Sequence, residues 1–108
     1  SIDDAANDVE KAMLTAFVEE YGEMPVSDVV YRGYDSAKLI AIALQNTSDI
    51  SDPDAIREAV LGITDHEGIA GTYNSSDGSG DGLTTARAYI VNGGKNVLFA
   101  DWLAENPQ

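Results

Sequence analysis

Cysteine is absent from this chain of 108 residues, and the chain contains a single histidine and only six lysines and arginines. Without cysteine there is no disulfide framework, no thiolate nucleophile and no zinc site of the cysteine type. Nineteen acidic residues give a net charge of -13, which argues against nucleic acid and against an anionic membrane surface as partners. No run approaches the roughly 18 apolar residues of a membrane-spanning helix. The hydrophobic content of 44% is that of an ordinary globular protein.

The first helix is predicted by one apolar stripe that repeats at four-residue steps. Its members are Val9, Met13, Phe17 and Tyr21. The segment Ser1–Asp4 supplies a cap and acids for the first turn, where the helix dipole favours negative charge. Gly22 is a natural stop, and Pro25 prevents the helix from continuing.

A second helix is predicted from about Ser27 or Asp28 to about Asn46. Its second half is unusual, because Lys38 is the one polar residue between Ala37 and Leu44. A helix that is apolar almost all round must be buried on several sides. The few other elements of a chain of this length can hardly surround it. We therefore expect a missing partner surface, either another subunit or the rest of a larger fold, and we expect this chain to self-associate.

The third helix has Asp52 as its cap and Pro53 at its first position, a favoured pairing. We expect its apolar residues Ile56, Val60 and Ile63 to face inward.

The last third of the chain changes from helix to strand patterns. Ile69–Tyr73 is predicted as a short strand, and residues 74–82 form a Ser- and Gly-rich loop. Two further strands, Ala86–Val91 and Val97–Phe99, flank a hairpin-like turn over residues 92–96. Trp102 and Leu103 follow the second of these strands. The expected fold class is α/β, with three helices and a short C-terminal set of strands.

The sequence predicts neither a metal site nor an enzyme. Asp77–Gly82 begins like a calcium loop, but the twelfth position, which needs a bidentate Glu, is Ala88. His66, the single histidine, is predicted to lie in a turn. The sequence shows no pattern that brings a nucleophile, a base and an orienting group together as a catalytic set. We therefore expect no catalytic residue, no metal and no cofactor.

Four residues at the start of the second helix are candidates for ligand binding, namely Tyr31, Arg32, Tyr34 and Asp35. A carboxylate ligand needs an Arg or free helix N–H groups, and an ammonium group needs a carboxylate or an aromatic face. The alternative is that the two tyrosine rings fill the core and the two charges are solvated.

Four segments occur in an order typical of one family. Gly33–Ala37 opens the second helix, Gly68–Tyr73 reads Gly-Ile-Ala-Gly-Thr-Tyr, Asp77-Gly78 follows, and Ala88–Lys95 comes last. In this order and spacing the chain resembles, from about Ala6 to Phe99, the C-terminal third of the periplasmic solute-binding proteins of branched-chain amino acid ABC transporters.

The resemblance implies a fragment of a two-lobed fold in which a ligand binds between lobes that close by a hinge motion. Residues 1–22 would belong to the C-terminal lobe, 23–28 to a crossover, 29–85 to the N-terminal lobe, and 86–108 to a final hairpin and tail. Most ligand contacts of the family would then lie upstream of this chain. The Gly- and Ser-rich loop over residues 74–82 departs from the family pattern and leaves the strand register open.

The resemblance also implies a function. The whole protein would bind an amino acid or a related small carboxylate and deliver it to a membrane permease. It would be periplasmic or extracellular, with an export signal that this sequence does not contain. The alternative is a cytosolic small-molecule sensor of the same fold that acts through a protein partner. The sequence does not name the ligand.

Overall fold

The computed structural model describes all 108 residues as a mixture of helices and short strands. The elements are a 3-10 helix η1 (Ile2–Asp4), α1 (Asp8–Tyr21), α2 (Val29–Asn46), α3 (Pro53–Leu61), β1 (His66–Glu67), β2 (Thr72–Tyr73), β3 (Tyr89–Asn92), β4 (Lys95–Leu98) and α4 (Phe99–Glu105). The strands form two separate antiparallel pairs, β1 with β2 and β3 with β4. A mixed helix and strand chain is therefore confirmed.

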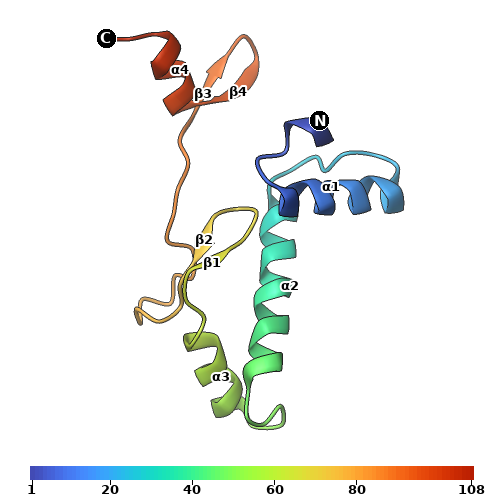
Figure 1. Ribbon diagram of the computed structural model, residues 1–108, viewed down its shortest axis with the longest axis vertical. Coiled ribbons are helices and arrows are strands. Elements are labelled where there is room, and N and C mark those ends of the chain that lie inside the picture. The colour runs from blue at the N-terminus through green and yellow to red at the C-terminus, as the bar shows by residue number, and fades with distance from the viewer.

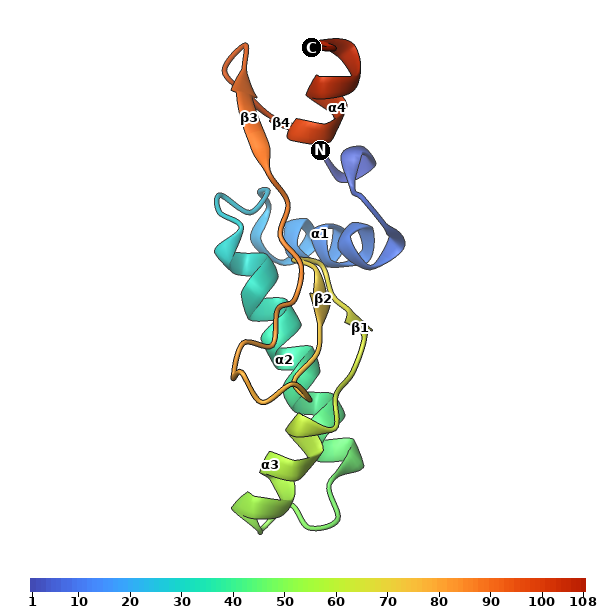
Figure 2. The ribbon, with the colours of Figure 1, turned by 90° about the vertical axis from the view of Figure 1, so that its left-hand side faces the viewer.

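The chain is elongated. Helix α1 crosses one end of α2, while α3 and the β1–β2 hairpin lie along the side of α2 (Figure 1). An extended segment then carries the chain to the β3–β4 hairpin and α4, at the opposite end of the molecule from α3 (Figure 2). The radius of gyration is 16.9 Å and the extents are 52 × 38 × 19 Å. A compact domain of this length has a radius of gyration of about 13 Å.

The core is small and lies where α1 meets the start of α2. Met13 and Leu14 of α1 pack against Ile69, which follows β1, and Tyr31 and Tyr34 of α2 cover this cluster. The accessible surface of the chain is 7728 Å², which is about 2,000 Å² more than a compact monomer of this mass exposes. The chain therefore leaves uncovered much surface that a compact fold buries.

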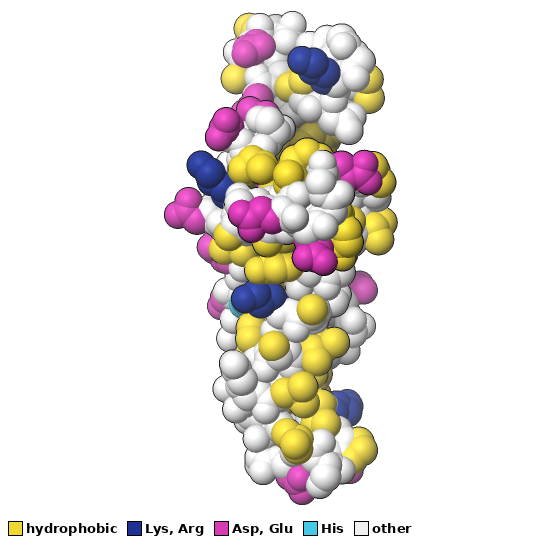
Figure 3. Space-filling view, turned by 90° about the vertical axis from the view of Figure 1, so that its right-hand side faces the viewer, with side chains coloured by type: hydrophobic (Ala, Val, Ile, Leu, Met, Phe, Trp, Pro, Cys, Tyr) yellow, Lys and Arg dark blue, Asp and Glu magenta, His cyan; other side chains and the backbone are white.

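Helix α2 has the predicted bounds, with Asp28 as its N-cap residue. Only two of its residues, Asp35 and Ala43, are buried. Ile40 is 60% exposed and Leu44 is 44% exposed. Hydrophobic side chains follow the free face of this helix in Figure 3. The chain itself thus leaves one face of α2 uncovered, which confirms the expectation that its few other elements can hardly surround this helix. What covers that face stays a prediction.

Helix α1 begins later than its sequence indicates. Asn7 is its cap residue and accepts the backbone N–H of Glu10 at 2.9 Å. The acids Asp3 and Asp4 instead belong to the separate helix η1. The predicted end is confirmed, because Gly22 closes α1 in the left-handed conformation with φ of 75°.

Helix α3 starts as predicted. Asp52 accepts the backbone N–H of Asp54 at 3.0 Å, and Pro53 is the first helical residue. Ile63 is buried after the helix, whereas Val60 remains 38% exposed, so its predicted inward position is wrong.

Strands β2 and β3 are shorter than predicted, whereas β4 begins at Lys95 and is longer than the predicted strand Val97–Phe99. Strand β2 holds only the last two residues of the expected strand Ile69–Tyr73, and it pairs with β1 around His66, where a turn was expected. The hairpin turn narrows to Gly93 and Gly94, both at positive φ. Residues 99–105 form α4, a fourth helix that the sequence did not predict.

A candidate ligand cleft at the start of α2

A cleft of about 680 Å³ lies at the N-terminal end of α2. Its walls come from four parts of the chain: Val26–Arg32 with the start of α2, the turn Ile69–Ala70, the extended segment Leu83–Arg87, and Glu10 of α1. Tyr89 and Asn96 of the β3–β4 hairpin reach its rim. The volume lies within the range of about 300–1,000 Å³ that small-molecule sites occupy.

The structure brings two of the four predicted site residues to this cleft. Tyr31 and Arg32 line it. Tyr34 packs against the core, and its ring lies 5.7 Å from the Lys38 ammonium. Asp35 is 1% exposed and points to the backbone of the segment after β1. The alternative considered for this cluster was that the tyrosine rings fill the core. It holds for Tyr34, while Tyr31 both packs against the core and lines the cleft.

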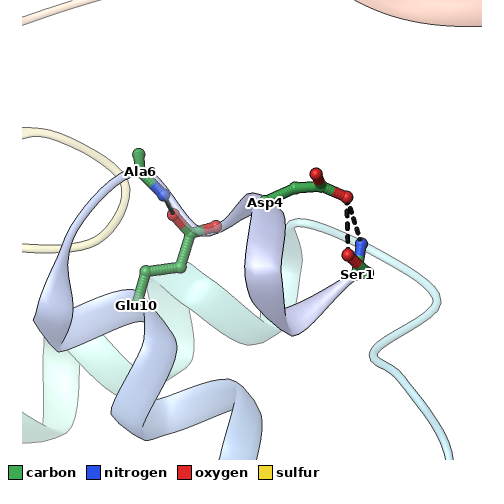
Figure 4. Close-up of polar contacts among 4 residues, drawn as sticks. All are labelled: Ser1, Asp4, Ala6 and Glu10. Atoms are coloured by element: carbon green, nitrogen blue, oxygen red, sulfur yellow. Dashed lines mark hydrogen bonds and ion pairs between the residues drawn. The ribbon is translucent and has the colours of Figure 1, made fainter.

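Glu10 supplies the first carboxylate of the cleft. Its side chain accepts the backbone N–H of Ala6 at 2.7 Å, which orients the carboxylate at the start of α1 (Figure 4). Burial first, and the nearby charge of Glu10 second, raise the pKa of the Tyr31 hydroxyl. Glu10 and Tyr31 thus come from different helices and face the same space. No sequence signal distinguishes Glu10, which lies off the apolar stripe of this helix.

Two guanidinium groups complete the charged lining. Arg32 forms an ion pair with Asp28 at 3.5 Å, and both side chains are largely exposed. Such a surface pair contributes little to stability. Arg87 also lines the cleft, and it forms no ion pair within the chain. No sequence signal distinguishes Arg87, which lies inside the predicted strand Ala86–Val91.

The segment that carries Arg87 is held beside β2 by backbone and side-chain hydrogen bonds. Thr72 donates its N–H to the Thr85 hydroxyl at 3.0 Å, and its carbonyl accepts the N–H of Thr84 at 3.0 Å. Gly71 allows this close approach, since a Cβ there would overlap the Thr85 side chain. The cleft wall after β2 is therefore fixed to the same hairpin as the turn Ile69–Ala70.

A second, more open hollow lies at the other end of α2. Its hydrophobic lining is Ile42 and Ile63, and its remaining walls are polar segments that include Asn46 and His66.

No group of three or more His, Asp or Glu side chains lies close enough together to hold a metal ion. In the loop that begins like a calcium loop at Asp77, the Asp77 carboxylate accepts the N–H and the hydroxyl of Ser79. These hydrogen bonds lower the pKa of Asp77.

Comparison with protein-family models, with curated proteins and with solved structures finds no match to this chain. None of its helices combines the length and the apolar character that crossing a bilayer requires.

Proposed function

We propose that this chain is the C-terminal portion of a solute-binding protein of an ABC importer and that its cleft contributes to binding an amino acid or a related small carboxylate. Two observations support this proposal: the order of the four sequence segments, which carries the resemblance to solute-binding proteins, and the cleft at the start of α2. The observation that carries it is the meeting of an anionic, a cationic and an aromatic side chain in one cleft, from Glu10, Arg87 and Tyr31. A zwitterion of small size needs that set of groups.

Each of these groups has a specific role in the proposal. The Arg87 guanidinium, which has no carboxylate partner in the chain, binds the ligand carboxylate through two parallel N–H donors. Glu10, held by the Ala6 N–H, faces the ligand ammonium. The Tyr31 ring covers ligand carbon and presents its hydroxyl to a polar group. Arg32 adds positive charge at the rim, partly offset by Asp28.

The large accessible surface supports the second part of the proposal, that the chain is part of a larger fold. In a two-lobed protein the free face of α2, with Ile40 and Leu44 exposed, packs inside a complete lobe. Residues 1–22 then belong to the C-terminal lobe, 23–28 to a crossover, 29–85 to the N-terminal lobe and 86–108 to the final hairpin and tail. The ligand is delivered from the periplasmic or extracellular side to a membrane permease, and no bond is made or broken.

Calorimetry on the full-length gene product tests the binding claim. The titrants are L-leucine, its carboxylate-only analogue 4-methylpentanoate, and its ammonium-only analogue 3-methylbutylamine, followed by the other standard L-amino acids. We expect saturable binding of one or more amino acids and weaker binding of an analogue that lacks either charge.

Two variants locate the site. Arg87→Gln is expected to weaken amino acid binding by about 10- to 100-fold, because a charge-assisted hydrogen bond contributes about 1.5–3 kcal/mol. Arg57→Gln, on α3 and outside the cleft, is the matched control and is expected to leave affinity unchanged. Equal affinities for the wild-type protein and Arg87→Gln would remove this cleft from the ligand site.

A further inference from the structure

The Asp35 side chain is the one buried charged group of the chain, at 1% exposure. Its Oδ1 atom accepts the backbone N–H of Ile69 at 2.8 Å, and its Oδ2 atom accepts the backbone N–H of Ala70 at 2.8 Å. The Tyr73 hydroxyl also donates to Oδ2, at 3.0 Å. No cation pairs with Asp35. A buried carboxylate without a cation is costly unless hydrogen bonds satisfy it, so these three donors keep it in place.

The three donors all belong to one turn and the strand that follows it. The turn is closed by the Gly68 N–H, which donates to the Gly71 carbonyl at 2.8 Å. A Cβ atom at Gly68 would lie 2.6 Å from Oδ2 of Asp35. The backbone of the turn therefore rests directly on the carboxylate, with no room for a side chain between them.

The same turn is a wall of the cleft. Ile69 and Ala70 line the cleft from one side, and Tyr31 lines it from α2. Asp35 stands one helical turn after Tyr31 on α2. The carboxylate thus joins the two opposing walls, one through its own helix and the other through two backbone N–H groups.

We propose that Asp35 is a positioning residue that sets the width of the cleft by pinning the backbone of Ile69 and Ala70 to α2. This inference rests on the proposed function for the identity of the ligand, but not for the pinning itself. Asp35 does not touch the ligand. Its carboxylate fixes where the turn lies relative to Tyr31, and a ligand that fits between these walls depends on that placement.

The first test is amide hydrogen exchange measured by NMR on the chain itself. Asp35→Asn keeps the size of the side chain but replaces one carboxylate oxygen with an NH₂ group. This NH₂ group then faces an N–H donor, and the hydrogen bond that the oxygen accepted there is lost. We expect exchange at Ile69 and Ala70 to accelerate at least tenfold relative to exchange at Ala43, a buried residue in the second half of α2. Unchanged exchange ratios in Asp35→Asn would overturn the proposal.

The matched control lowers stability without touching the turn. Asp52→Ala removes the cap of α3, where Asp52 accepts the Asp54 N–H, and Asp52 does not line the cleft. We expect exchange at Ile69 and at Ala43 to rise together in this variant. If Asp52→Ala changes the ratio as Asp35→Asn does, the effect is general destabilisation and the positioning role is wrong.

A milder variant covers the case in which Asp35→Asn fails to fold. Tyr73→Phe removes one of the three donors and leaves the carboxylate and both backbone hydrogen bonds. We expect a smaller acceleration, of about threefold, confined to the same two amides. No acceleration there in Tyr73→Phe overturns the proposal when Asp35→Asn is unfolded.

The second test is affinity, measured on the full-length gene product with whichever standard L-amino acid binds the wild-type protein most tightly. Asp35→Asn is expected to weaken this binding at least tenfold, and Asp52→Ala is expected to leave it unchanged. If no amino acid binds the wild-type protein, the proposed function fails while the exchange ratios still decide the pinning. If the ratios change as expected but affinity does not, the turn is pinned by Asp35 without setting the cleft.

Discussion

The carboxylate of Asp35 accepts the backbone N–H of Ile69 at 2.8 Å across 34 positions of sequence. This bond connects the middle of α2 to the turn after β1, and it brings a charged group and an apolar core residue into direct contact. Ile69 packs on Met13 and Leu14 with its side chain while its N–H points to Asp35. The small core and the candidate cleft therefore share one backbone segment.

Two glycines that the sequence does not distinguish are expected to respond oppositely to alanine. Gly68→Ala places a Cβ against the Asp35 carboxylate and should lower the free energy of unfolding by about 1–3 kcal/mol. Gly33→Ala, inside α2 with nothing within 4 Å of the added Cβ, should raise it by about 0.5–1 kcal/mol. Urea denaturation of the two variants and the wild-type chain measures both changes. Similar losses in both variants would mean that the turn does not rest on Asp35.

The stability of the chain is expected to fall at alkaline pH through Tyr73. Burial, then the hydrogen bond to Asp35 and its charge, raise the pKa of Tyr73 to about 12, whereas an unfolded tyrosine has a pKa of about 10. Between these values the unfolded chain releases a proton that the folded chain keeps, so the free energy of unfolding decreases as pH rises. The contribution of Tyr73 to the free energy of unfolding is therefore fully present below about pH 10 and is lost as the pH rises above that value.

Denaturation at a series of pH values from 8 to about 11 measures the slope of the free energy of unfolding against pH. Tyr73→Phe should flatten it. Tyr31→Phe is the control that removes the other tyrosine with a raised pKa, and it should flatten the slope less. A slope that is the same in Tyr73→Phe and in the wild-type chain contradicts the buried position of the hydroxyl.

The sequence predicted the helices well where local signals decide them. The Asp52-Pro53 start of α3 and the Gly22 end of α1 depend on capping chemistry within a few residues, and the structure confirms both. Helix α4 was missed because Phe99–Glu105 is short and continues directly from a strand. Its Phe99 and Trp102 rings stack with centroids 6.0 Å apart. This contact forms only once the helix has formed, so it could not be used to predict the helix from the sequence.

The site was harder to predict, because its parts meet only in the folded chain. An aspartate is expected at the surface, so nothing local to Asp35 showed that it would be buried. Its donors lie more than thirty residues away. Glu10 and Arg87 reach the cleft from α1 and from an extended segment, and neither has a spacing that marks it. Tyr31 and Arg32 were found because they stand together at a helix start.

The isolated chain is expected to self-associate through the free face of α2, since exposed contiguous apolar surface drives association. A stable interface needs about 800 Å² from each partner, less than the surplus surface of this chain. Sedimentation velocity at tens of micromolar should show a dimer or a larger species. Ile40→Lys, at a position 60% exposed on α2, should shift it toward the monomer.

The matched control for this prediction is Val91→Lys, on the β3–β4 hairpin at 73% exposure. It changes the same kind of side chain away from α2 and should leave the association unchanged. Loss of association in Val91→Lys alone would place the contact on the hairpin, and a wild-type monomer would mean that the free face of α2 drives no association.

The proposed binding of a small zwitterion in the cleft at the start of α2 is tested by calorimetric titration of the full-length gene product with the standard L-amino acids. We expect saturable binding of at least one amino acid, weakened about tenfold or more by Arg87→Gln and left intact by Arg57→Gln. Absence of binding across all of the amino acids, or binding that Arg87→Gln leaves unchanged, would rule out this cleft as the ligand site.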